Sequence, residues 1–381
     1  GFNLVGEDPW LMMLSALGFS YLMFLSGLEV DFSGLLNVRN RAYTRPLGNP
    51  LSLGLAVFAL TVGAGLVVAL GLTLVDLIQN PLIMALILST TSLGIVVPVL
   101  KERSLSGSHY GQSLLVSALV ADFATLLLIS VVVAALSHGL TLDLLLVLLL
   151  LGAFATLARL GQRAARAPRL RRLIDDLSHT TAQIQVRGAF AFMVAFIVLA
   201  EGLGTEIILG AFLAGAIISL LAEREGSNLH MKLEAIGFGF FVPIFFIMVG
   251  VGFDLPALLS SSQALLLVPL LLAVAYAIKF LAALLYRLNF SWRETLAAGS
   301  LLSSRLSLII AAAAIALGLG IINEAINAAI ILVAIVTSTL SPMLFNRLLP
   351  PKEIPVRQGI ILAGLGDLSV LLAERLRQAG E

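Results

Sequence analysis

The segment PLIMALILSTTSLGIVVPVLKE, residues 81–102, decides the fold. It is apolar over about 20 residues, which is the length that a helix needs to cross the hydrocarbon core of a bilayer. Its centre, Ser89 to Gly94, is rich in hydroxyl groups, and Pro98 follows. Both features weaken or open a helix inside a membrane. The sequence therefore predicts a membrane-spanning helix that is interrupted near its middle.

The whole chain has the composition of a membrane protein. Of its 381 residues, 59% are hydrophobic and 12% are charged, and the mean hydropathy is +1.05. A soluble domain of this size cannot hide so much apolar surface from water. The absence of cysteine excludes disulfides, thiol catalysis and cysteine-bound metal. The apolar runs predict an all-α polytopic membrane protein with eleven helices, at 10–37, 52–76, 81–102, 110–137, 141–160, 182–203, 206–224, 236–253, 263–288, 293–319 and 322–348.

A second interrupted segment lies in the C-terminal half, where residues 299–305 read GSLLSSR. One interrupted helix in each half is typical of the inverted repeats of secondary transporters. The transmembrane domain would cover residues 1–349, with repeats at about 1–160 and 182–349 and a basic linker at 161–181. In the alternative interpretation, the hydroxyl groups only bond to carbonyls of their own helices or allow close helix packing.

Three charged residues fall deep inside the predicted spans, far from either end: Asp122, Lys279 and Arg305. When alternate connections are placed on opposite faces, every other Lys and Arg falls on one face, which should be cytoplasmic. Charged side chains are costly at membrane depth, so they usually face the protein interior and mark an ion or proton path. Two alternatives stay open. Lys279 could reach the interface with its long stem, and Arg305 could serve only to clamp helices.

Three further motifs resemble a known family. Residues 21–29 read YLMFLSGLE, residues 209–215 read LGAFLAG and residues 243–250 read PIFFIMVG. With the break at Thr91 and Ser92, they are similar to the monovalent cation:proton antiporter-2 family, which contains Kef-type potassium/proton and related sodium/proton antiporters. The resemblance implies a fold of thirteen helices, the first two preceding residue 1. It also implies a homodimer and an elevator-like alternating-access cycle.

The chain departs from this family at two positions. Electrogenic members have Asp-Asp and Kef-type members have Gln-Asp where this chain has Ala121-Asp122, so one carboxylate is left. The family often has Arg-Gly-Glu where this chain has Arg305-Leu306-Ser307, so the usual acidic partner of Lys279 is missing. We expect a monovalent cation or a proton to bind at Asp122 with Thr90, Thr91 and Ser92, with Lys279 and Arg305 as supporting charges and Ser303 and Ser304 as further contacts.

The expected function is secondary active antiport rather than enzymatic catalysis. Competition of a cation and a proton for one carboxylate would exchange one for the other and make transport electroneutral. Potassium is the expected ion, because of the single acid and the Kef-like tail, and sodium is the alternative. Two other classes stay open, a ligand-gated cation channel without proton coupling and a membrane-embedded sensor. The sequence contains no evident repeat of a selectivity filter, which is an argument against the channel.

The tail at 350–381 contains GIILAGLGDLS at residues 359–369. This apolar strand followed by G-x-G-x-x-S resembles the start of a Rossmann-like nucleotide-binding regulatory domain, with Gly364 and Gly366 as nucleotide contacts, although Ser369 replaces the third glycine. We expect no cofactor in this chain, and a nucleotide of the NAD(H) or AMP type in a full-length domain. The other expected partners are potassium or sodium ions, protons and lipid, without nucleic acid. The expected location is the bacterial inner membrane, with the C-terminus in the cytoplasm.

Overall fold

The computed structural model describes residues 8–29, 47–138, 152, 156, 183–203, 207–221, 228–253 and 255–350. The described helices belong to one unit of the chain that ends at Leu349. Most of the span predicted at 141–160, the end of the span predicted at 10–37, and Gly364 and Gly366 lie outside the described residues.

The described part of the chain is helical, without strands. It contains eight helical segments long and apolar enough to cross a membrane, or nine when the bent pair α15–α16 is counted as one span. The predicted all-α polytopic fold is therefore confirmed. The elements are α1 (Pro9–Leu28), α3 (Pro50–Leu74), α4 (Pro81–Ser89), α5 (Leu93–Glu102), α6 (His109–His138), α9 (Ile184–Gly202), α10 (Ile207–Leu221), α11 (Asn228–Ile236), the π-helix η1 (Gly237–Phe241), α12 (Val242–Val251), α13 (Leu255–Ser260), α14 (Ser262–Ala283), the 3-10 helix η2 (Leu284–Leu288), α15 (Trp292–Leu302), α16 (Ser307–Gly318) and α17 (Glu324–Leu348).

Three spans begin at an acidic or amide residue followed by proline. The side chains of Asp8, Asn49 and Asn80 each accept a hydrogen bond from the backbone N–H two residues further on, at 2.8, 2.9 and 3.1 Å. These bonds satisfy backbone donors that the first helical turn leaves free. The proline at the first helical position has no N–H to satisfy and already has a helical φ. Local sequence therefore fixes where α1, α3 and α4 start.

The helix predicted at 236–253 begins earlier than expected, at Asn228. The predicted start was wrong because polar and apolar residues alternate at 228–234, which therefore lie outside the continuous apolar run. His230 and Glu234 nevertheless lie on one helical face, with 3.2 Å between Nε2 and Oε1, as residues four positions apart do in a helix. The helix then passes through the π-helical turn Gly237–Phe241 before α12.

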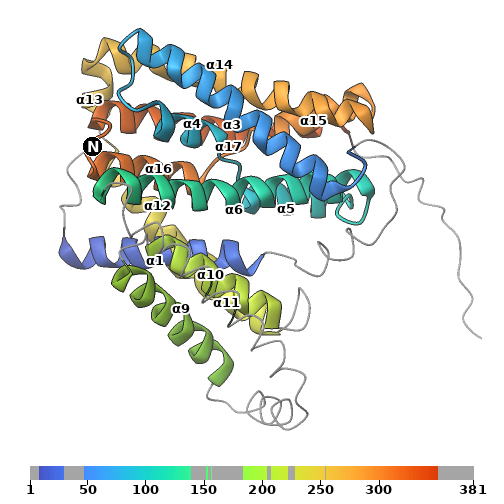
Figure 1. Cartoon of the computed structure of the whole chain (residues 1–381). Coiled ribbons are helices and arrows are strands. Elements are labelled where there is room, and N and C mark those ends of the chain that lie inside the picture. Colours follow the sequence, from blue (N-terminus) through green and yellow to red (C-terminus); the bar gives the residue numbers. More distant parts are fainter. Residues whose placement is uncertain are drawn as a thin grey trace, which may run out of the picture. The chain divides into compact units, whose positions relative to one another are not determined.

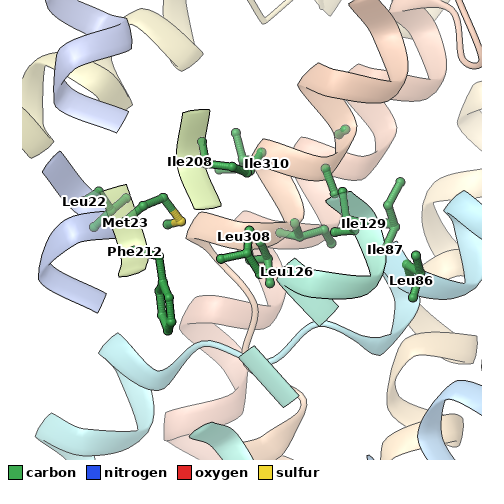
Figure 2. Packing of buried hydrophobic residues seen from close by; sticks show 14 of the residues in the cluster. Leu22, Met23, Leu86, Ile87, Leu126, Ile129, Ile208, Phe212, Leu308 and Ile310 are labelled. Carbon is green, nitrogen blue, oxygen red and sulfur yellow. The ribbon is translucent and has the colours of Figure 1, made fainter. Parts of the chain in front are cut away.

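Two groups of helices make up the unit (Figure 1). The helices α1, α9, α10 and α12 pack together, and α3 to α6 pack with α14 to α17. The groups meet where α10 approaches α6. Ile208 and Phe212 of α10 belong to the same buried apolar cluster as Leu308 and Ile310 of α16 (Figure 2). The rings of Phe212 and Phe123 stack with their centroids 5.6 Å apart, so the seam between the groups is apolar.

Two glycines bring α1 and α10 into close contact. A Cβ atom on Gly27 would lie 2.0 Å from the Phe212 carbonyl oxygen, and a Cβ atom on Gly215 would lie 1.9 Å from the Phe24 carbonyl oxygen. Small residues at such positions let helix backbones approach each other inside a membrane. Both glycines belong to the motifs at 21–29 and 209–215, so these motifs encode a helix contact.

We expect Gly215→Ala to destabilise the protein by roughly 1–3 kcal/mol, because the added methyl group must push the two backbones apart. The change should lower the apparent Tm by several degrees in a thermal scan of the purified protein in detergent. Gly63→Ala is the matched control, since a Cβ atom on Gly63 in α3 meets nothing within 4 Å. Equal Tm values for the two variants would contradict the close contact.

Candidate functional site

The first interruption is an extended stretch between α4 and α5. Thr90 has φ −54° and ψ 150°, and Ser92 has φ −110° and ψ 110°. Thr90, Thr91 and Ser92 are all buried, with at most 4% of their surface exposed. The break frees the last carbonyls of α4 and the first N–H groups of α5 in the middle of the protein. It therefore places the C-terminal end of α4 and the N-terminal end of α5, which carry opposite partial charges, inside the protein.

The second interruption crosses the first. It separates α15 from α16 at residues 303–306, and the two helices are bent by 41° relative to each other. The Ser92 backbone N–H donates to the Ser304 carbonyl at 2.9 Å, and the Thr91 hydroxyl donates to the Leu302 carbonyl at 3.2 Å. The two segments, more than 200 residues apart in the sequence, thus satisfy part of each other's backbone.

Two buried cations satisfy the carbonyl end of α4. The Lys279 ammonium on α14 donates to the Ser89 carbonyl at 2.9 Å and to the Thr91 hydroxyl at 2.6 Å. The Arg305 guanidinium donates to the carbonyls of Leu88 at 2.7 Å and Thr90 at 3.1 Å. Positive charge is favourable at the C-terminal end of a helix. Lys279 is 3% exposed, so its head lies inside the crossing and does not reach the interface.

Asp122 lies on α6 beside the opposite end of the break. It is 6% exposed and is the one buried acid among the described residues. Its carboxylate lies beside the backbone N–H of Leu93, the first residue of α5, which interacts favourably with the negative charge. A helix N-terminus favours negative charge, so α5 is suited to hold this carboxylate. Lys279 donates to the break, and its charge acts on Asp122 at longer range.

The structure brings all the described residues of the expected site to this crossing, but their oxygens are used unequally. The Thr90 carbonyl and the Thr91 hydroxyl already accept from Arg305 and Lys279. The hydroxyls of Ser303 and Ser304 donate to the carbonyls of Gly299 and Leu301. Ser303 and Ser304 therefore agree with the alternative interpretation of the sequence, in which hydroxyl groups bond to carbonyls of their own helix.

Two contributors were not identified from the sequence. One is the Leu93 backbone N–H that faces Asp122. The leucine side chain does not indicate this role, and only the position of the helix break could have suggested it. The Ala275 carbonyl, which accepts from Arg305 at 3.2 Å, lies in the apolar helix α14, and the Ala275 side chain gives no indication of this contact. Tertiary packing, and not local sequence, determines which backbone groups take part in the site.

The arrangement defines a class of protein. Two broken helices that cross at membrane depth beside interior charges are the architecture of secondary transporters, in which half-helix ends and freed carbonyls surround the ion site. The family follows from comparison: the model of the sodium/hydrogen exchanger transmembrane domain matches residues 1–349. The chain belongs to this family of cation:proton antiporters.

Curated relatives carry the names of sodium and potassium transport proteins. The putative Na+/H+ antiporter YjbQ of Bacillus subtilis is 37% identical over 93% of this chain and 57% of its own length. The probable Na+/H+ antiporter 3 of Methanocaldococcus jannaschii is 28% identical over 92% of this chain and 87% of its own length. The glutathione-regulated potassium-efflux system protein KefC of Cronobacter sakazakii is 29% identical over 68% of this chain and 40% of its own length. The chain thus spans little more than half of the Bacillus relative.

Proposed function

We propose that this chain is the membrane domain of a monovalent cation/proton antiporter in which the two ions compete for Asp122. The observation that carries the proposal is the buried Asp122 carboxylate at the N-terminus of the half-helix α5. A carboxylate in this place holds either a cation or a proton, and release of one allows the other to bind. Movement of the helix group that contains Asp122 would then expose the site to the two sides in turn, in an elevator-like cycle.

The expected stoichiometry is one proton for one cation. Asp122 is the single buried acid of the described residues, so each turn of the cycle exchanges one positive charge for another. Transport of this kind moves no net charge and is insensitive to the membrane potential. A current that reverses with the potential in leak-free vesicles would rule out this stoichiometry.

Sodium is the first candidate ion, because it is the ion in the names of the relatives from Bacillus and Methanocaldococcus. Potassium, the ion expected from the sequence, is the second candidate and is favoured by the similarity to KefC. We place the protein in the inner membrane as a homodimer, with its basic loops in the cytoplasm. Residues 350–381 would begin a nucleotide-binding regulatory domain through Gly364 and Gly366.

The test is an assay in proteoliposomes that contain a pH-sensitive dye. The protein should move protons when a sodium or potassium gradient is imposed, and protein-free liposomes should not. The cation that drives proton movement at the lower concentration identifies the preferred substrate. Cation flux without a dye response would instead support a ligand-gated cation channel.

A further inference from the structure

Many buried serine and threonine hydroxyls in the described helices donate to a carbonyl of their own helix. The hydroxyl of Thr61 donates to the Val57 carbonyl at 2.7 Å, and the hydroxyl of Ser130 donates to the Leu126 carbonyl at 3.0 Å. Bonds to a carbonyl one turn back are how serine and threonine satisfy their hydroxyl groups inside membrane helices. A buried hydroxyl without any hydrogen-bond partner therefore needs a separate explanation.

Thr125 is such an exception, and it lies beside the proposed ion site. The residue is fully buried at 0% exposure, and its Oγ1 atom has no hydrogen-bond partner within the part of the chain that the structure describes. It follows Asp122 by three positions on α6, and helical residues three apart share a face with their Cβ atoms about 5–6 Å apart. A free hydroxyl oxygen therefore lies one turn from the carboxylate.

A small cation can bind the Asp122 carboxylate and the Thr125 hydroxyl at the same time. The hydroxyl oxygen has two lone pairs and no competing acceptor bond, so it can coordinate a cation with its oxygen. The Thr90 carbonyl and the Thr91 hydroxyl accept from Arg305 and Lys279. They are less available than Thr125 in the arrangement that the structure shows.

We infer that Thr125 is a second side-chain ligand of the cation that binds at Asp122. This inference rests on the proposed antiport function and deepens it, because a hydroxyl oxygen next to the carboxylate would set the affinity for the cation. The proton, in contrast, needs only the carboxylate. Loss of the hydroxyl should therefore weaken cation binding and leave proton loading of Asp122 in place.

Thr295 provides a matched control on α15. It is also buried, at 1% exposure, and its hydroxyl is also without a partner among the described residues. Its neighbour Glu294 accepts through its carbonyl from the Tyr110 hydroxyl, in the first turn of α6. Tyr110 precedes Asp122 by twelve positions, or roughly 18 Å along the helix at 1.5 Å per residue. A general effect of removing an unpaired hydroxyl would appear at both threonines.

The experiment compares Thr125→Val, Thr125→Ser and Thr295→Val with the unchanged protein. The apparent KM for sodium and for potassium is measured in proteoliposomes at fixed pH, and binding of radioactive sodium and of a radioactive potassium substitute, rubidium, is measured on purified protein in detergent. We expect Thr125→Val to raise KM and weaken binding about tenfold, as loss of a good polar contact does. Thr125→Ser should stay close to the unchanged protein, and so should Thr295→Val. The Tm without added cation should not fall in Thr125→Val, because valine has nearly the shape of threonine.

An unchanged cation affinity in Thr125→Val, or an equal loss in Thr295→Val, would overturn the inference and leave the antiport proposal standing. A loss in Thr125→Ser as large as in Thr125→Val would also overturn it, because serine keeps the hydroxyl. If the unchanged protein binds cations but moves no protons, the antiport proposal fails. The binding data on the three variants then still decide the role of Thr125.

Discussion

Asp122→Asn is expected to reduce cation-driven proton movement in proteoliposomes to the level of protein-free liposomes. Asparagine has nearly the size of aspartate and can still place an oxygen beside the Leu93 N–H. It cannot carry a negative charge or take up a proton in the range where carboxylates titrate. The variant should therefore fold normally, bind cations weakly and transport neither ion.

Asp76→Asn is the matched control for this experiment. Asp76 is an exposed residue after α3 with φ 54°, a backbone conformation that asparagine also tolerates. The same chemical change at this position should leave transport unaltered. Full antiport activity in Asp122→Asn would remove the basis of the single-carboxylate mechanism. Activity lost in both variants would point to damage unrelated to the site.

The sequence was sufficient to predict the helical framework of the described residues and to select the residues of the candidate site. Apolar length gave the spans, and the hydroxyl-rich segments at 89–94 and 299–305 coincide with the two interruptions of the structure. Asp122, Lys279 and Arg305 were identified because charge inside an apolar span is costly and therefore rare. Apolar length, hydroxyl-rich segments and charges inside apolar spans all depend on the side chains of a short stretch of sequence, so they can be recognised without knowing the fold.

The partners of the charged residues could not be predicted in the same way. The absence of the family's acidic residue left Lys279 without an assigned partner, and the structure supplies the Ser89 carbonyl and the Thr91 hydroxyl instead. Every residue except proline offers the same backbone groups, so a carbonyl acceptor leaves no mark in the sequence. Thr125 was overlooked for a related reason, because a threonine in a helix normally bonds to its own backbone.

Replacing Arg305 is expected to have the largest effect on stability of any single change in the crossing. The guanidinium is 0% exposed and donates to the carbonyls of Leu88, Thr90 and Ala275. It therefore ties α14 and the C-terminal end of α4 to the second break. Arg305→Met keeps the apolar stem and removes every donor. The carbonyls then lack partners where no water can replace them, at about 1–3 kcal/mol for each.

The result should be a loss of at least about 3 kcal/mol, seen as a large fall in Tm and as aggregation during purification. Arg305→Lys should recover part of the stability, because an ammonium can donate to some of these carbonyls but lacks the planar fork that reaches several at once. Arg287→Met is the control, since Arg287 donates to Phe290 and stacks on Trp292 at an exposed position, where such contacts contribute little. If Arg305→Met were as stable as Arg287→Met, the guanidinium would not hold the crossing together.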